Sequence, residues 1–438
     1  MLLTPIQIQN SFLKLGPNRK WSFYNIGRSE TNAFTHGYHR YPAKFIPHIV
    51  RELIVHYTSP GDLICDPFGG CGTTLVESKL LGRRSIGFDI NPVAKLITQT
   101  KVTPINPKTL ENTLKKFTDY YKSIKATSLP INNEKLLYWF DENTIKELNK
   151  IYTSIKFIKN YNVRRFYFCA FSHILKNCSR WLMKSIKPTI DKEKIPAIPI
   201  EIFYHHLRFM TKRNNQFFNL LTEKNCINTT AKMRIADSTK KLPLKTNSIN
   251  LIVTSPPYVT SYEYADLHQL SLLWFGNDKD YFKKWDRHIE DFNGFRKRFV
   301  GTSLRKNKKK ELLNSIIANN IVSELSAKNK SLAESVTHYF SDMNRAFIEM
   351  FRILRSNKKA AVIIGDTTLQ NIDITNSMVV AEQMQNIGFR PVEFIKREVT
   401  NKMITPWRDG EDGRFTSTNN PNKKRVYQYE YLIIMKKI

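Results

Sequence analysis

Residues 62–74 read DLICDPFGGCGTT, an order of strand, glycine-rich loop and helix start. The apolar run from Leu63 to Cys65 breaks into a loop at Asp66, and three glycines follow before Thr73 opens a helix. Glycine reaches positive φ and lets a ligand approach the backbone closely, and the first N–H groups of the next helix stay available to bind that ligand. This order is typical of a nucleotide-cofactor pocket, although glycines at such a turn also serve tight helix-to-strand packing.

Helix and strand signals alternate on both sides of this loop. Apolar residues recur at helical spacing through residues 47–57, and another helix is expected directly after the glycines. Residues 85–89 then predict a strand that ends in Asp89. Asp89 follows Asp66 by about 20 residues, the interval at which a dinucleotide-binding fold positions an acid for ribose hydroxyls. Capping of the next helix is the alternative role, which Asn91 could share.

The same alternation returns at residues 233–258, which read MRIADSTKKLPLKTNSINLIVTSPPY. Residues 234–237 predict a strand ending in an acid, and residues 250–254 predict a buried parallel strand that runs directly into Ser255-Pro256-Pro257-Tyr258. Helices are then expected at 331–354 and 376–387, and strands at 360–364, 391–394 and 427–435. In an open α/β sheet, ligands bind beyond the carboxyl ends of the strands, so the glycine loop, the acids and the Ser-Pro-Pro-Tyr turn should share one edge. We therefore expect an α/β fold with helices on both faces of the sheet.

The composition points to a polyanionic partner. The chain has 438 residues and a formal net charge of +31, which favours nucleic acid first and an anionic membrane surface second. It contains no apolar run of about 18 residues, and its first residues lack the pattern of a secretory signal. Its five cysteines form no CxxC pair, which favours a reduced protein in the cytoplasm. His205 and His206 have no cysteine partners at zinc-finger spacing, so we expect no metal site.

Residues 103–230 carry a different pattern, rich in Lys, Arg, Asn and aromatic residues at amphipathic helical spacing. We interpret them as a mainly helical domain inserted between two parts of a catalytic domain, residues 1–102 and 231–438. Interleaved basic and aromatic residues, as in 161–181, can grip phosphates and stack on bases, which favours DNA target recognition. The alternative is a helical domain whose aromatic residues are buried and whose lysines are only solvated.

Two further segments stand apart from the α/β pattern. Residues 278–330 form a basic insertion that includes the run Arg305 to Lys310, which suits a solvated loop or a DNA contact. Residues 1–35 are mixed and aromatic, and we expect them to form an irregular arm.

The chain resembles the DNA amino-methyltransferases that use S-adenosyl-L-methionine and carry DPFxGxGT and SPPY motifs. The first motif is matched by Asp66, Pro67, Phe68, Gly70, Gly72 and Thr73, and the second by residues 255–258. Residues 41–45, Tyr-Pro-Ala-Lys-Phe, are similar to the segment with which the family holds the methionine end of the cofactor. The likeness covers roughly 36–100 and 233–276, is weaker over 340–438 and does not cover the helical insertion. It implies a Rossmann-like methyltransferase sheet, S-adenosyl-L-methionine as cofactor and double-stranded DNA as partner.

The resemblance also implies which residues form the site. The expected cofactor-binding residues are Ala43, Lys44, Asp66, Pro67, Phe68, Gly70, Gly72, Thr73, Asp89, Ile90, Asp237 and Ser238. The expected catalytic residues are Ser255, Pro256, Pro257 and Tyr258. In this arrangement the glycine loop wraps the methionine part, Asp89 binds the ribose hydroxyls, and Asp237 with Ser238 lies near the adenine amino group.

The residue types of the Ser-Pro-Pro-Tyr turn suit methylation of a base amine. An exocyclic amine is a poor nucleophile because its lone pair is delocalised into the ring. Ser255 Oγ and the Pro256 carbonyl can accept hydrogen bonds from the amine and localise that lone pair, while the prolines stiffen the loop. Tyr258 can stack on a base that has rotated out of the duplex. An ordinary proline turn is the alternative.

The motif favours one target base. SPPY in this family usually accompanies methylation of cytosine N4, and NPPY or DPPY more often that of adenine N6. We therefore expect a cytosine-N4 modification enzyme of a restriction-modification system, with a cognate restriction endonuclease as possible partner. The alternatives are an adenine-N6 DNA enzyme, an RNA base amino-methyltransferase, or a non-catalytic nucleic-acid-binding protein. A C5-cytosine mechanism is disfavoured because the chain has no Pro-Cys dipeptide.

Overall fold

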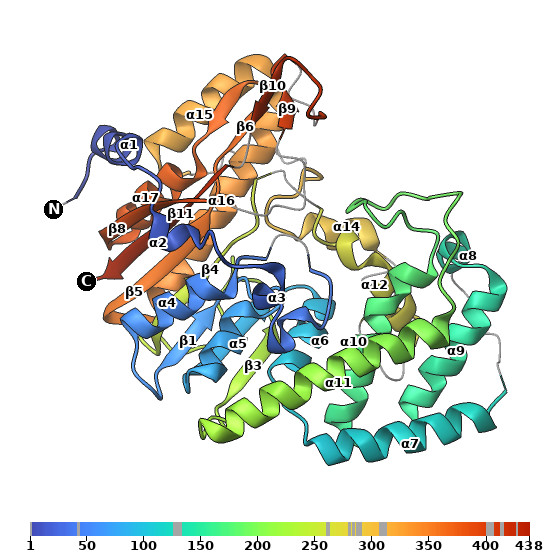
Figure 1. Ribbon diagram of the computed structural model, residues 1–438. Coiled ribbons are helices and arrows are strands. Elements are labelled where there is room, and N and C mark those ends of the chain that lie inside the picture. Colours follow the sequence, from blue (N-terminus) through green and yellow to red (C-terminus); the bar gives the residue numbers. More distant parts are fainter. Residues whose placement is uncertain are drawn as a thin grey trace.

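The computed structural model confirms an α/β fold built on one mixed sheet (Figure 1). It describes residues 2–41, 44–125, 134–259, 263–278, 282, 285, 291–305, 313–399, 407–411, 416–425 and 428–438. In this part of the chain the main sheet has seven strands, in the order β3-β2-β1-β4-β5-β11-β8. Their bounds are β1 Leu63–Asp66, β2 Arg84–Asp89, β3 Ala231–Ile235, β4 Ile249–Thr254, β5 Leu354–Ile364, β8 Phe389–Glu398 and β11 Tyr429–Lys437.

Strand direction brings the predicted motifs to one edge of the sheet. Strands β3, β2, β1, β4 and β5 pair in parallel, and β11 runs antiparallel to both β5 and β8. The carboxyl ends of the parallel strands carry Asp66, Asp89 and Thr254, the last residue before the Ser-Pro-Pro-Tyr turn. The loops that follow these strands therefore emerge side by side, as the rule for open α/β sheets requires.

Alternating side chains of the strands pack against helices on opposite faces. On one face Ile64, Leu251 and Ile363 pack with α4 (Pro47–Tyr57). On the other, Cys65 and Ile252 join the core formed with α16 (Lys330–Ile353) and α17 (Asn376–Ile387). This period of two follows from the pleat of the strand and accounts for the continuous apolar runs seen in the sequence. Helices α5 (Thr73–Leu80) and α6 (Pro92–Lys101) follow β1 and β2.

Residues 103–230 are mainly helical where the structure describes them, with a non-helical segment over 179–198 that contains a β-bridge between Trp181 and Ile190. Their helices are α7 Pro107–Ser123, α8 Glu134–Trp139, α9 Glu142–Lys156, α10 Tyr161–Cys178 and α11 Pro199–Glu223. In Figure 1 they gather on the side of the molecule away from β8. Phe166, Phe171 and Trp181 are buried in a core shared with α6 and α12 (Gln269–Gly276). These aromatic residues hold the insertion together and do not face solvent.

Helices also interrupt the chain between β4 and β5. They comprise the 3-10 turn η2 Asp266–His268, α12, α14 Phe292–Lys297, α15 Ile316–Lys328 and α16. Two small hairpins follow β5: β6 Thr367–Leu369 with β7 Ile372–Ile374, and β9 Trp407–Asp409 with β10 Lys423–Arg425. The aromatic residues of the segment 262–275 predict a helix over that range, but the observed helix α12 begins later, at Gln269. Position 262 lies outside the described residues, as does most of the basic run 305–310.

The expectation of an irregular N-terminal arm is wrong. Residues Pro5–Leu13 form helix α1, and two short helices, α2 (Arg19–Ser22) and α3 (Arg28–Thr31), follow. Thr4 and Gln7 cap the N-terminus of α1 reciprocally. The Thr4 N–H donates to Gln7 Oε1 at 2.8 Å, and the Gln7 N–H donates to Thr4 Oγ1 at 3.2 Å. Phe12 is buried against Phe394 of β8, with ring centroids 4.6 Å apart. Among the described residues, no helix combines the length and apolar character needed to cross a bilayer.

Candidate active site

A hydrogen bond joins the two strand ends from which the glycine loop and the Ser-Pro-Pro-Tyr turn leave the sheet. Strand β1 pairs directly with β4, so Asp66 and Thr254 end neighbouring strands although 188 positions separate them. The buried Thr254 hydroxyl donates to Asp66 Oδ1 at 2.7 Å. The loops after both strands consequently start from the same point of the sheet edge.

Asp66 is buried, and only one of its two carboxylate oxygens accepts hydrogen bonds from the described residues. Its Oδ1 also accepts from the Phe68 N–H at 3.1 Å. Its Oδ2 is buried and accepts no hydrogen bond within the described part of the chain. Burial raises the pKa of Asp66 to about 6, although hydrogen bonds oppose this shift. A buried carboxylate with an unused oxygen suits a cationic or hydrogen-bond-donating ligand.

Asp89 is positioned by the glycine loop itself. Its Oδ2 accepts from the Gly70 N–H at 3.1 Å and its Oδ1 from the Asn91 N–H at 2.8 Å. The cap of α6 comes from the Asn91 side chain, which accepts from the Val93 N–H at 2.9 Å. Asn91 therefore takes the capping role that was the alternative for Asp89. Burial raises the pKa of Asp89 to about 6, and the following Ile90 is partly buried beside the insertion core.

The glycines of the loop serve packing as well as ligand access. Gly72 has φ +80° and is the N-cap of α5, with Thr73 the first helical residue. A Cβ at Gly72 would lie 2.4 Å from Cγ2 of Thr98 on α6, so a side chain there would push the helix away. The Thr98 hydroxyl donates to the Gly70 carbonyl at 2.8 Å. Beside Gly70 lies Tyr41, whose hydroxyl is 3.2 Å from the position a Cβ would take.

Two lysines lie beside the glycine loop, of which Lys101 is buried and Lys44 is half-buried. Lys44 Nζ donates to Asn32 Oδ1 at 2.6 Å, and burial with the nearby Lys101 lowers the pKa of Lys44 to about 8. Lys101 Nζ donates to the Cys71 carbonyl at 3.1 Å. They add positive charge next to the loop that was predicted to hold the methionine end. Ala43 lies outside the described residues.

Asp237 and Ser238 follow β3 at the same edge. The Ser238 hydroxyl donates to the Pro67 carbonyl and so holds the start of the glycine loop against the segment that follows β3. Asp237 closes a local turn, because its Oδ1 accepts from both the backbone and the hydroxyl of Thr239, at 3.0 and 2.7 Å. Its Oδ2 lies 3.7 Å from Lys240 Nζ.

The tyrosine of the Ser-Pro-Pro-Tyr turn, Tyr258, is held by a hydrogen bond to strand β11. Tyr258 donates to Glu430 Oε1 of β11 at 3.2 Å, and its ring lies against Gly365. Glu430 in turn accepts from Arg397 Nη1 of β8 at 2.5 Å, directly across the two strands. Burial, together with the Glu430 charge, raises the pKa of Tyr258 well above its usual range. Pro256 is buried.

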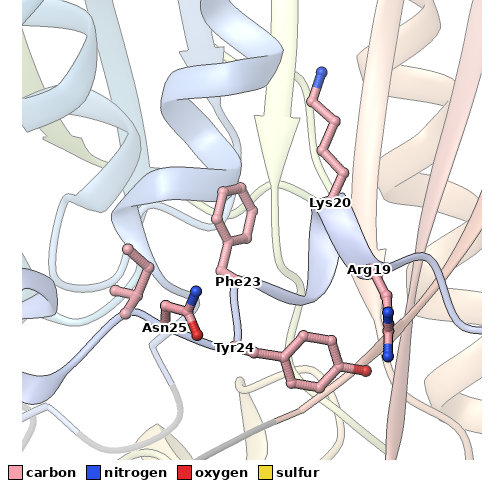
Figure 2. A pocket seen from close by; sticks show the side chains of 6 residues that line it. Arg19, Lys20, Phe23, Tyr24 and Asn25 are labelled. Carbon is pink, nitrogen blue, oxygen red and sulfur yellow. The ribbon is translucent and has the colours of Figure 1, made fainter.

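A cleft of about 840 Å³ opens at residues 19–26 of the N-terminal arm, which contacts strand β8 (Figure 2). It is lined from the N-terminal arm by Arg19, Lys20, Phe23, Tyr24, Asn25 and Ile26. Tyr24 donates to Glu398 Oε2 at 3.0 Å, and Arg397 Nε donates to the Trp21 carbonyl at 3.0 Å. The arm is thereby connected through Arg397 and Glu430 to Tyr258.

Several supporting residues were not predicted from the sequence. Thr254 directly precedes the Ser-Pro-Pro-Tyr turn, so its position was a usable signal. Thr98, Arg397 and Glu430 carried none, because they lie far along the chain on elements whose local pattern indicates only helix or strand. Ser255 and Pro257, half-buried, begin and continue the turn at the end of β4.

This chain is similar to proteins described as DNA methylases or type II methyltransferases. A family model described as DNA methylase, N6_N4_Mtase, matches residues 10–100. Type II methyltransferase M.MvaI of Kocuria varians is 26% identical over 425 residues, covering 90% of this chain and 88% of that protein. M.BsoBI of Geobacillus stearothermophilus is 23% identical over 425 residues, covering 86% and 82%.

A solved structure gives a weaker likeness. It is a TehB-like SAM-dependent methyltransferase from Corynebacterium glutamicum, 7% identical, covering 89% of this chain and 87% of that one, with a TM-score of 0.28. The fold is defined by the order and direction of the strands in the seven-stranded sheet.

Proposed function

We propose that this chain, a member of the S-adenosyl-L-methionine-dependent DNA amino-methyltransferases of the N4/N6 family, methylates cytosine N4 in double-stranded DNA. The hydrogen bond between Thr254 and Asp66 carries the proposal. It brings a candidate donor-binding loop and a candidate base-binding turn to one point, as a two-reactant transfer needs.

The residues around the glycine loop suit the proposed cofactor. Oδ2 of Asp66, buried and without a hydrogen bond among the described residues, is a fitting partner for the ammonium of the methionine end. Lys44 and Lys101 lie close enough to this loop to favour a carboxylate. Asp89, held by Gly70 and Asn91, would accept from the ribose hydroxyls, with Ile90 beside it. Asp237 and Ser238 would border the adenine.

The cofactor supplies an electrophilic methyl group, and the protein supplies orientation. Ser255 Oγ and the Pro256 carbonyl would accept hydrogen bonds from the base amine and direct its lone pair toward that methyl group. Pro256 and Pro257 limit the motion of the turn. The Tyr258 ring, fixed at its hydroxyl by Glu430, would support the extruded base by stacking.

The choice of cytosine N4 over adenine N6 rests on the Ser-Pro-Pro-Tyr sequence. The test is to methylate duplex DNA with the purified protein, digest it to nucleosides and identify the modified nucleoside by mass spectrometry. We expect N4-methylcytosine. N6-methyladenine would refute the base assignment while leaving the reaction class intact, and transfer to tRNA with none to DNA would refute the substrate.

The similarity to type II methyltransferases supports a role in modification beside a restriction endonuclease. We further propose that residues 103–230 contribute to recognition of the target sequence, since their basic charge suits DNA. Plasmid DNA from cells that express the protein should resist the endonuclease specific for the methylated site. Cleavage of that plasmid at every such site would argue against this role.

A further inference from the structure

A second hollow, of about 390 Å³, is lined by residues that follow β3, by the segment 297–305 and by helix α16. Its lining includes five basic residues from three separate segments: Lys240, Lys297, Arg298, Arg305 and Arg345. Only two acids line it, Asp237 and Asp342. The wall therefore carries three more positive than negative charges, and such a concentration of like charge favours an anionic occupant.

The arginines of this hollow are held in place before any ligand arrives. Asp342 of α16 is buried and pairs with Arg305 at 2.6 Å and also with Arg345. Arg305 additionally donates to the carbonyls of Lys297 and Phe299, at 2.7 and 3.0 Å. One carboxylate shared by two guanidinium groups leaves a net positive charge and fixes their directions.

The remaining cations are exposed. Lys297 and Arg298 end helix α14 and form no ion pair within the described part of the chain. Lys240 lies 3.7 Å from Asp237. Exposed cations beside fixed arginines are the arrangement with which proteins bind phosphates.

Two contacts locate the hollow next to both loops. Asp237 directly precedes Ser238, whose hydroxyl bonds to Pro67 of the glycine loop. On the other side, Gly301 follows the Lys297–Arg298 segment and has φ +84°. A Cβ at Gly301 would lie 2.7 Å from the Tyr258 carbonyl oxygen, so this segment packs directly on the Ser-Pro-Pro-Tyr turn.

We propose that this hollow binds a backbone phosphate of the DNA strand that carries the extruded nucleotide. The inference rests on the proposed function and adds a specific anchor to it. An extruded base must be held through its own sugar and phosphates, and a phosphate bound between the two loops would fix the nucleotide's position without reading its sequence. Lys297 and Arg298 would supply most of the salt-sensitive part of that contact.

The experiment compares two double variants with the same loss of charge. K297Q/R298Q removes a lysine and an arginine from the hollow. K232Q/R355Q removes an exposed pair from near the amino ends of β3 and β5, at the opposite edge of the sheet. Affinity for a fluorescent duplex is measured over a series of salt concentrations, and S-adenosyl-L-methionine affinity is measured by calorimetry.

We expect the salt slope of log Kd to fall by about 1 in K297Q/R298Q, because one lost phosphate contact removes roughly 0.9. The control pair should keep the wild-type slope, and both variants should keep the wild-type cofactor affinity. Equal slopes in the two variants, or a loss of cofactor affinity in K297Q/R298Q alone, would overturn the assignment.

Methyl transfer separates this inference from the proposed function. If the wild-type protein methylates no DNA under any condition, the proposed function fails. If it methylates DNA while K297Q/R298Q keeps the wild-type slope, only the phosphate anchor fails.

Discussion

Replacement of Thr254 by valine removes the hydroxyl that connects the two loops and keeps the branched shape of the side chain. In the wild type this hydroxyl donates to Asp66 Oδ1 at 2.7 Å and stabilises the ionised carboxylate. Its loss leaves Asp66 with the Phe68 N–H and the Thr74 hydroxyl as the groups that still favour the ionised form. The variant should therefore hold the proton of Asp66 more tightly.

The size of the effect follows from the charge of the acceptor. A hydrogen bond to an ionised group contributes about 1.5–3 kcal/mol, and 1.36 kcal/mol corresponds to about one pH unit. The wild-type pKa of Asp66 is raised by burial to about 6. Because the lost bond favours the ionised form, the protonation midpoint should move upward by about one to two pH units.

Cofactor binding reports this change. If the cationic methionine end requires ionised Asp66, wild-type affinity should weaken about tenfold per pH unit below about pH 6. The midpoint of this loss should lie higher in T254V, which gives about two- to tenfold weaker binding at pH 7. Affinity should return to the wild-type value near pH 9. Calorimetric titration of S-adenosyl-L-methionine across this pH range measures both midpoints.

Thr35 offers a matched control. It is as buried as Thr254, but its hydroxyl has no hydrogen-bond partner in the described structure. T35V should therefore leave the pH profile unchanged. A T254V profile that coincides with that of T35V would refute the role of the hydroxyl, and weaker binding at every pH would show that ionisation of Asp66 is not the cause.

Three further outcomes test other parts of the site. Ser255→Ala should lower kcat at least a hundredfold with unchanged cofactor affinity, and a wild-type rate would remove Ser255 from the chemistry. Asp89→Ala should weaken cofactor binding by about 1.5–3 kcal/mol in calorimetry, because it removes the hydrogen bonds that the ribose hydroxyls would donate to a charged carboxylate. An affinity equal to that of the wild type would place the ribose elsewhere. Arg397→Met leaves the Glu430 carboxylate without its cation and should lower the unfolding free energy by about 3 kcal/mol in urea titrations, and adding Glu430→Gln should restore part of it. If R397M unfolds at the wild-type urea concentration, the Arg397–Glu430 ion pair does not stabilise the fold.

Local pattern was enough to predict the α/β class and most element positions. Apolar periodicity predicted α4 and α17 with the bounds that the structure shows, because helix periodicity is written in consecutive residues. Glycine and proline punctuation likewise located the loops after β1 and β4. The arm was misjudged because the capping box of Thr4 and Gln7 is short and its helix is stabilised by distant partners in β8 and α17.

Other features depend on chain segments that are far apart. Nothing local indicates that β1 lies beside β4, that Thr254 bonds to Asp66, or that Tyr258 is held by Glu430, 172 positions later. These contacts arise only when strands pair across the sheet, and pairing is selected by the packing of both faces together. The amino-acid sequence thus specified which chemical groups stand at the strand ends, and the tertiary structure decided which of those groups meet.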